Sequence, residues 1–85
     1  MYRVILHRRA ARFYDRLSEK QKNRLDKAID RLEDNSLYGR DIKKLRGELK
    51  EKYRLKVGPF RIVYLVDEKR NLVIIESIGP RGDIY

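Results

Sequence analysis

Cysteine and tryptophan are absent from this 85-residue chain, and histidine occurs once. Without cysteine there are no disulfides and no thiolate metal ligands, which fits a reducing compartment. The single histidine, His7, has no second histidine at ligand spacing, and the acidic residues are scattered among basic neighbours, so we expect no metal site. The glycine-rich phosphate loops of the Walker and dinucleotide kinds are missing too. We therefore expect no cofactor.

Long apolar runs are also absent. Nowhere do about 18 apolar residues follow one another, and the N-terminal stretch MYRVILHRRAARFYD has only a short apolar run and no small-residue cleavage site. We expect a soluble cytoplasmic protein without a membrane partner. The length is that of one small domain, residues 1–85, with room for one hydrophobic core.

Positive charge is what the chain has in excess. The net charge is +9, and charged residues make up 41% of the sequence. Residues 1–39 carry a net charge of +4, residues 40–61 carry +6 and residues 62–85 carry −1. This concentration favours a polyanionic partner, namely RNA, DNA or an acidic protein segment. The alternative is a well-solvated surface on a thermostable protein.

The middle of the basic region predicts a β-hairpin. Residues 53–64, YRLKVGPFRIVY, read as two strands joined by Gly58 and Pro59. With a two-residue loop, Lys56 faces Arg61 across the ladder. One hairpin face is then apolar, and the other carries three cations: Arg54, Lys56 and Arg61. Like charges opposite each other destabilise a ladder, so an anionic ligand would offset the cost of the cationic face.

The segments before the hairpin predict one strand and two helices. Residues 2–6 are apolar and β-branched, as in a short strand. Apolar residues then recur at helical spacing over residues 10–17 and again over residues 25–32. Ser18 and Gln21 have the spacing of a capping box, so the second helix should start directly after the first and pack antiparallel to it.

The remaining segments complete an α+β fold. Residues 37–47 predict an irregular loop, which Ile42 and Leu45 should pin to the core. Residues 49–57 and 60–66 are expected to form two strands, and residues 67–71 a polar turn. Residues 72–78 are expected to form a central, strongly apolar strand. The result is a mainly antiparallel four-stranded sheet, formed by the N-terminal strand and a three-strand meander, with one face packed on the helix pair. The cationic hairpin face should then be open to solvent.

A cation-rich site without metal can act on phosphate esters. Attack of a ribose 2′-hydroxyl on its own 3′-phosphate needs a group that takes the hydroxyl proton, charge stabilisation for the transition state, and a proton for the leaving 5′-oxygen. Arginine and lysine stabilise phosphate charge, often through bidentate contacts. From the residues alone, plain nucleic-acid binding ranks above this chemistry. His7 is expected to be a surface or structural residue rather than a catalytic one.

Four motifs give the chain a family resemblance. They are Lys44-Leu45-Arg46-Gly47, Tyr53-Arg-Leu-Lys-Val57, Phe60-Arg-Ile-Val-Tyr64, and Gly79-Pro-Arg81 followed by Tyr85. Together with the preceding strand and helix pair, they resemble toxins of the RelE family, in the larger RelE/ParE superfamily, over essentially the whole chain. The resemblance implies a type II toxin that cuts messenger RNA in the ribosomal A site by 2′-hydroxyl attack, without a metal. It also implies a cognate acidic, RelB-like antitoxin that holds the toxin silent.

The resemblance also implies roles for individual residues. Lys56 would help to deprotonate the 2′-hydroxyl, and Arg54 occupies a neighbouring position usually held by lysine. Arg61 would stabilise the transition-state phosphate, Arg81 would assist or protonate the leaving group, and Tyr85 would stack on a base. Contacts to the phosphates of messenger and ribosomal RNA are expected from nearby basic residues: Lys43, Lys44, Arg46 and Lys52.

Two other functions remain open at this stage. A ParE-like toxin would bind and poison DNA gyrase instead of cutting RNA, and the fold cannot separate the two activities. The combination of basic residues favours the ribonuclease, because a gyrase poison has no need of the set Arg54, Lys56, Arg61 and Arg81. A non-catalytic RNA-binding member is the other alternative.

Overall fold

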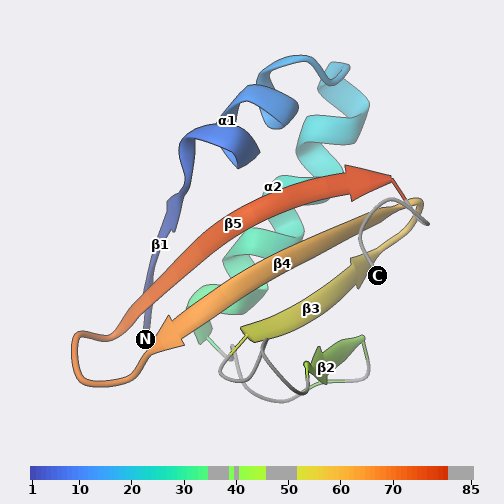
Figure 1. The fold of residues 1–85 in the computed structure, drawn as a ribbon. Coiled ribbons are helices and arrows are strands. Elements are labelled where there is room, and N and C mark those ends of the chain that lie inside the picture. Colours follow the sequence, from blue (N-terminus) through green and yellow to red (C-terminus); the bar gives the residue numbers. More distant parts are fainter. Residues whose placement is uncertain (35–38, 40, 46–51, 81–85) are drawn as a thin grey trace.

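The computed structural model of the chain describes residues 1–34, 39, 41–45 and 52–80 (Figure 1). Its elements are β1 Arg3–Leu6, α1 Arg8–Asp15, α2 Glu19–Asp34, β2 Ile42–Lys44, β3 Lys52–Val57, β4 Phe60–Asp67 and β5 Leu72–Pro80. The strands form one sheet in the order β1-β5-β4-β3-β2. β1 pairs with β5 in parallel, and the other neighbours pair antiparallel. The predicted α+β fold with a mainly antiparallel sheet is therefore confirmed.

The sheet has one strand more than the four predicted. β2 lies in the segment predicted as a loop and pairs with β3 at the edge of the sheet. Ile42 faces Leu55 across this pairing and packs against the core, as its predicted pinning role requires. Leu45 is half-buried, and its backbone N donates to the carbonyl oxygen of Lys52 at 2.9 Å. Three residues are too few for strand alternation to stand out in a sequence, and this is why β2 was missed.

The β3–β4 hairpin has the predicted two-residue turn. Val57 pairs with Phe60 and Lys56 with Arg61, which leaves Gly58 and Pro59 as the loop. Gly58 has a φ of +56°, a conformation that glycine adopts readily. A Cβ placed on Gly58 would lie 2.5 Å from Nη1 of Arg24. α2 thus contacts the turn through a side chain that lies directly over this glycine.

β5 lies between β1 and β4, as predicted for the apolar final strand. Val63 pairs with Ser77 and Tyr64 with Ile75, so Glu76 is the extra residue of a β-bulge. The bulge interrupts the alternation of β5 at its middle. It is one reason why a strict period-2 pattern is weak in this strand.

The two helices follow each other across a short turn at residues 16–18. The capping box is confirmed, because Ser18 N donates to Gln21 Oε1 at 3.2 Å and Gln21 N donates to Ser18 Oγ at 3.3 Å. α1 begins earlier than the apolar spacing indicated, because His7 caps it: His7 Nδ1 accepts from Arg9 N at 3.3 Å. Neither helix in the described part of the chain is long and apolar enough to cross a membrane.

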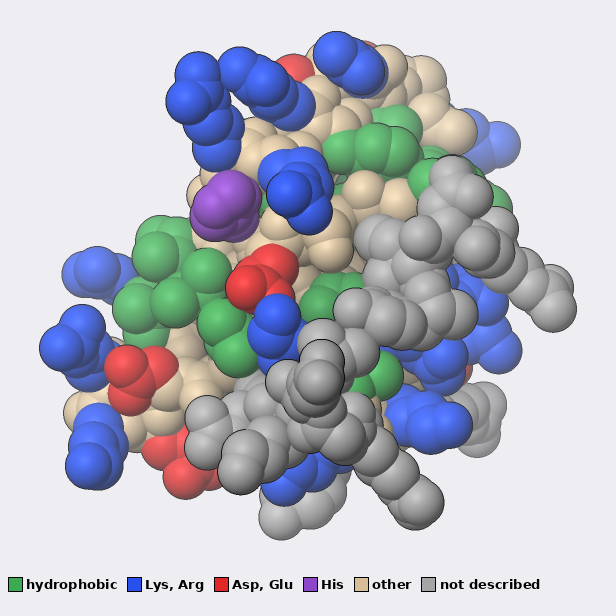
Figure 2. All heavy atoms as spheres, viewed as in Figure 1, with side chains coloured by type: hydrophobic (Ala, Val, Ile, Leu, Met, Phe, Trp, Pro, Cys, Tyr) green, Lys and Arg blue, Asp and Glu red, His purple; other side chains and the backbone are tan. Residues whose placement is uncertain are grey.

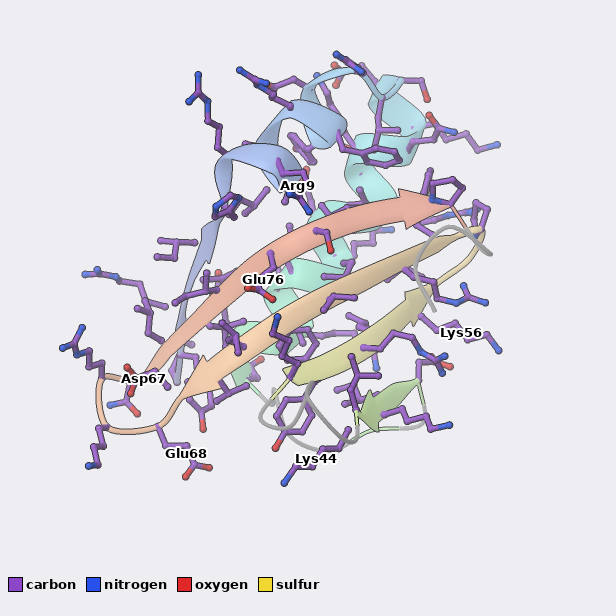
Figure 3. The ribbon with its side chains drawn as sticks, viewed as in Figure 1. Arg9, Lys44, Lys56, Asp67, Glu68 and Glu76 are labelled. Atoms are coloured by element: carbon purple, nitrogen blue, oxygen red, sulfur yellow. The ribbon has the colours of Figure 1, made fainter. Side chains whose placement is uncertain are left out.

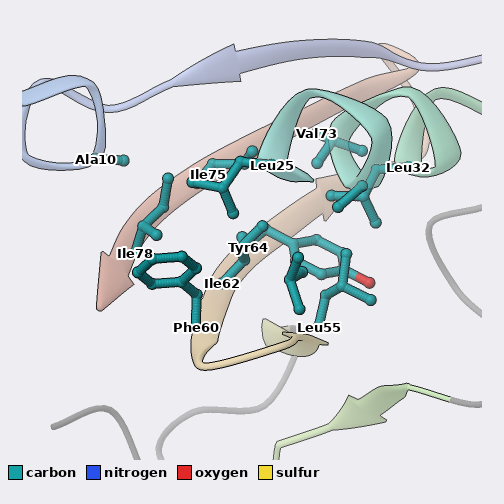
Figure 4. Close-up of a cluster of buried hydrophobic side chains, with 12 residues drawn as sticks. Ala10, Leu25, Leu32, Leu55, Phe60, Ile62, Tyr64, Val73, Ile75 and Ile78 are labelled. Atoms are coloured by element: carbon teal, nitrogen blue, oxygen red, sulfur yellow. The ribbon is translucent and has the colours of Figure 1, made fainter. Parts of the chain in front are cut away.

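The core lies between the helices and one face of the sheet (Figure 4). Leu25, Ala28 and Leu32 of α2 are buried, as their helical spacing predicted. Tyr64 is fully buried and stacks on Tyr53 with ring centroids 5.6 Å apart, and burial raises the pKa of its hydroxyl. Each fully buried leucine or isoleucine contributes about 1.5–3 kcal/mol. This layer of buried side chains therefore holds the hairpin against α2.

Replacing Gly58 by alanine should lower the free energy of unfolding by about 1–2 kcal/mol, because a left-handed backbone conformation is unfavourable for residues with a Cβ. Urea denaturation followed by circular dichroism measures the change. Gly58→Asn should lose less, since asparagine tolerates this conformation better. Arg24 is flexible and can move aside, so adding Arg24→Ala should not restore the stability of Gly58→Ala. A Gly58→Ala variant as stable as the parent would contradict this account of the turn.

Candidate functional site

Three cations lie in one row on the hairpin face that points away from the core. Leu55 and Val57 belong to the core, so strand alternation puts Arg54 and Lys56 on the other face. Lys56 pairs directly with Arg61, and directly opposed residues of an antiparallel ladder share a face. The prediction that Lys56 and Arg61 lie on one face is therefore confirmed. We call Arg54, Lys56 and Arg61 the cationic row.

The prediction that the cationic hairpin face is open to solvent is wrong for Arg61, which is buried. Only 5% of its surface is exposed, and it is the one buried charged residue in the described part of the chain. Its Nη1 donates to the carbonyl oxygens of Phe60 at 2.9 Å and Gly58 at 3.2 Å, so the guanidinium folds back over its own turn. Its partner on β5 is Gly79, which has no side chain to crowd it. These hydrogen bonds offset part of the cost of burying a charge.

Arg54 carries a buried donor without a partner. The residue is half-buried, and among the described residues its Nε is the one buried side-chain nitrogen or oxygen that makes no hydrogen bond. An unpaired buried donor costs about 1–3 kcal/mol, and more where it is charged. A phosphate or carboxylate oxygen at this position would remove that cost through a charge-assisted hydrogen bond. Lys56, the next member of the cationic row, is exposed and lies on the same face.

The predicted phosphate-binding residues are placed differently from one another. Lys43 pairs with Arg54 and is exposed, so it extends the cationic row onto β2. Lys44 pairs with Tyr53 and belongs to the alternate row of the sheet. Three predicted site residues lie outside the described part of the chain: Arg46, Arg81 and Tyr85. Their roles stay predictions.

Lys52, the remaining predicted contact, is engaged in an ion pair. Its Nζ lies 2.7 Å from Oε1 of Glu76, the bulge residue of β5. The pair borders a polar pocket of about 240 Å³ that His7 and Arg9 also line (Arg9 and Glu76 are labelled in Figure 3). His7 caps α1 here, in keeping with the structural role predicted for it. No group of three or more His, Cys, Asp or Glu residues that could hold a metal ion is found in the ranges that the structure describes.

The same sheet face has an apolar part. Ile5 pairs with Ile74, and Ile74 pairs with Leu65, so three apolar side chains cross β1, β5 and β4. Ile5 is 43% exposed, and the other two are half-buried. Figure 2 shows hydrophobic side chains gathered on this face beside the histidine. We call these three residues the apolar row, which is typical of a surface that a partner covers.

α2 presents further cations that the sequence interpretation did not single out. Four of them are exposed along one side of the helix: Lys20, Arg24, Lys27 and Arg31. We call them the α2 basic stripe. They line a groove of about 490 Å³ with residues of the β3 end of the hairpin. Their spacing of i, i+4, i+7 and i+11 is a helical period, so the sequence alone could have revealed them.

Comparison with known proteins points to one superfamily. The sequence model described as the ParE toxin of the type II toxin–antitoxin system parDE matches residues 4–85. An archaeal RelE–RelB complex from Pyrococcus horikoshii OT3 contains a chain of 28% identity and TM-score 0.83, with 95% of this chain and 96% of that chain covered. The RelBE2 toxin–antitoxin complex from Mycobacterium tuberculosis gives 26% identity and a TM-score of 0.80 over 94% and 98% of the two chains. The isolated Escherichia coli RelE toxin, at 23% identity and TM-score 0.79 over 94% and 84%, shares the fold. No curated protein sequence gives a significant match.

The unpaired Arg54 donor leads to a prediction about stability and binding. Arg54→Leu should leave the free energy of unfolding unchanged or raise it by about 1 kcal/mol, because it removes a buried donor that lacks a partner. The same variant should bind a polyanion such as heparin more weakly. Urea denaturation and heparin-affinity elution measure the two effects. Arg70→Leu, at an exposed turn position, is the matched control and should change binding less. A loss of more than about 1 kcal/mol in Arg54→Leu would show that Arg54 serves the fold.

Proposed function

The chain belongs to the ParE toxin family of type II toxin–antitoxin systems, and from its basic residues we propose that it stops translation by cutting messenger RNA in the ribosomal A site. The proposed reaction is metal-independent cleavage by the ribose 2′-hydroxyl, in the cytoplasm where ribosomes work. The observation that carries this proposal is the cationic row. It sets an exposed lysine opposite an arginine, beside a second arginine whose buried Nε lacks a partner.

The cationic row offers the parts that this reaction needs. Lys56 serves as the base that accepts the proton of the 2′-hydroxyl, and the 2′-oxygen forms its bond to phosphorus while the bond to the next 5′-oxygen breaks. Arg54 and Arg61 hold the non-bridging oxygens, on which charge develops. By family resemblance, Arg81 gives the 5′-oxygen its proton and Tyr85 stacks on a base. The products are a 2′,3′-cyclic phosphate and a 5′-hydroxyl end.

Arg61 must change its hydrogen bonds to take part. Its Nη1 is bound to the carbonyl oxygens of Gly58 and Phe60, which are neutral acceptors. A phosphate oxygen is a stronger acceptor for a guanidinium, because both partners are charged. Substrate binding therefore draws Arg61 out of the turn by a side-chain rotation. The backbone pairing with Lys56 stays in place during this change.

A gyrase-directed toxin is the second candidate function. The family description itself favours it, because it names the ParE toxins. Against it stands the cationic row, which holds a buried arginine and a half-buried one that a gyrase poison has no use for. The two functions separate in parallel assays of the purified protein, one for messenger cleavage on translating ribosomes and one for DNA supercoiling by gyrase. Inhibition of supercoiling without messenger cleavage would reverse this ranking.

A cognate antitoxin is the proposed protein partner. Similar chains of known structure were solved as RelB–RelE complexes, and this chain has a net charge of +9. We propose an acidic, RelB-like antitoxin that covers the apolar row with apolar side chains and places acidic ones near the cationic row. Such a partner complements both kinds of surface on the sheet face.

Substitutions in the cationic row should stop cleavage and leave the fold intact. Lys56→Gln should slow cleavage by about 10²–10⁴-fold, because it removes the proposed base. Arg61→Lys keeps the charge but loses the planar pair of donors, and should slow cleavage by about 10²-fold. Primer extension on translating ribosomes gives the rates, and circular dichroism checks the fold. Lys69→Gln, in the exposed β4–β5 turn, should cut at the parental rate. Normal cleavage by both row variants would refute the site.

The reaction type has a test that does not depend on protein variants. A messenger with a 2′-O-methyl group on the nucleotide before the scissile bond should resist cleavage, because its 2′-oxygen carries no proton and cannot attack. An unmodified messenger should yield a 2′,3′-cyclic phosphate, which end-specific enzymatic treatment identifies. Cleavage of the methylated messenger at the same bond would mean that water is the nucleophile.

A further inference from the structure

We infer that the α2 basic stripe binds the phosphate backbone of a double-helical RNA, in a groove that meets the proposed cleavage site only at Lys56. The four residues are exposed and line one groove with Lys56, Asp41 and the Gly58 turn. Asp41 is the one carboxylate among the lining residues. The groove therefore presents five cations against one acidic side chain. This inference goes beyond messenger cleavage and does not require that the protein cuts RNA.

The arrangement of charge on α2 shows that the stripe is not a by-product of overall charge. α2 has five basic and five acidic residues, so its net charge is zero. At about 100° per residue, the four stripe residues fall within about 60° of one another around the helix axis. Four of the five acidic residues lie together on another side: Glu19, Asp26, Asp30 and Glu33. The fifth, Asp34, lies in the last turn, at the edge of the stripe. Among the described residues, no ion pair joins the stripe to a carboxylate.

Packing holds part of the stripe in place. Leu25, Ala28 and Leu32 fix the rotation of α2 against the sheet, because they are buried in the core. The stripe then borders the hairpin, and Arg24 lies directly over Gly58. The packing of α2 therefore fixes the side of the helix on which the stripe lies and its position beside the hairpin.

The chemistry of the groove favours nucleic acid over an acidic protein segment. Protein interfaces have apolar cores rich in aromatic residues, whereas the apolar lining residues here are Ala28 and Val57, which are 4% and 8% exposed. A protein partner would find little apolar surface to cover. Interfaces with nucleic acid are instead polar and strongly basic. Charge without apolar surface fits a phosphate backbone.

The lining residues also favour a double helix over a single strand. Proteins bind single-stranded RNA by stacking its bases on aromatic side chains, and no aromatic residue is among those that line the groove. From Lys20 to Arg31 the helix rises by about 16 Å, so the four cations can reach several phosphates of one strand. Recognition through phosphates alone is independent of sequence. The ligand class is thus the backbone of a folded RNA.

The test uses a triple variant and a matched control with the same loss of charge. Lys20→Gln, Lys27→Gln and Arg31→Gln remove three stripe cations and retain Arg24, which packs over the turn. The control removes three exposed cations elsewhere: Arg3→Gln, Lys69→Gln and Arg70→Gln. The probe is a 2′-O-methyl RNA duplex of mixed sequence, about 16 base pairs long. This duplex keeps the phosphates but cannot be cut by 2′-hydroxyl attack, so failure of the proposed cleavage would not affect the result.

Binding is measured by fluorescence anisotropy over a range of salt concentrations, after circular dichroism has shown that each variant folds. The stripe variant should bind more weakly, and the slope of log K against log salt should become shallower by about 2–3, since each lost phosphate contact removes about 0.9. The slope for the control should stay within about 0.9 of the parental slope, which is the contribution of one phosphate contact. Equal losses in both variants would overturn the inference, because net charge would then explain the binding. Unchanged duplex binding together with weaker binding of poly-glutamate would also overturn it and make the stripe a surface for an acidic protein.

Discussion

The pairing of β3 with β4 across the Gly58-Pro59 turn is the constraint on which the candidate sites depend. It sets Lys56 opposite Arg61 and, through the same alternation, turns Leu55, Val57 and Phe60 into the core. The turn is contacted from both sides, by Arg24 of α2 over Gly58 and by Arg61 through the Gly58 and Phe60 carbonyls. A slip of one residue would exchange the cationic and apolar faces. The core therefore fixes the geometry of the cations.

Most of the fold could be predicted from the sequence, because the strongest signals in the sequence are local ones. The hairpin register follows from a Gly-Pro turn between alternating strands, and the start of α2 follows from the Ser18 and Gln21 capping box. β2 was missed because a strand of three residues has no readable period and owes its existence to its pairing with β3. The early start of α1 depends on a His7 cap that apolar spacing does not reveal.

Less of the candidate site could be predicted from the sequence, since burial depends on what covers each residue. Alternation placed Arg61 on the correct face, but a sequence pattern cannot show that its guanidinium folds onto backbone carbonyls and loses contact with water. Nor can it show that Lys52 is paired with Glu76, because that contact depends on a bulge in β5. The α2 basic stripe is different. Its helical spacing is visible in the sequence, so the stripe could have been predicted from it.

The energetics of the cationic row favour a function that uses it. Arg54 keeps an unpaired buried donor, and Arg61 keeps a buried charge whose partners among the described residues are neutral carbonyls. Both features cost stability, and a leucine or methionine in either place would pack without that cost. The fold can host other activities, because residues on this face can change while the core stays the same. Cations held at a cost on such a face therefore indicate an anionic ligand that satisfies them, as the phosphate of the proposed substrate would.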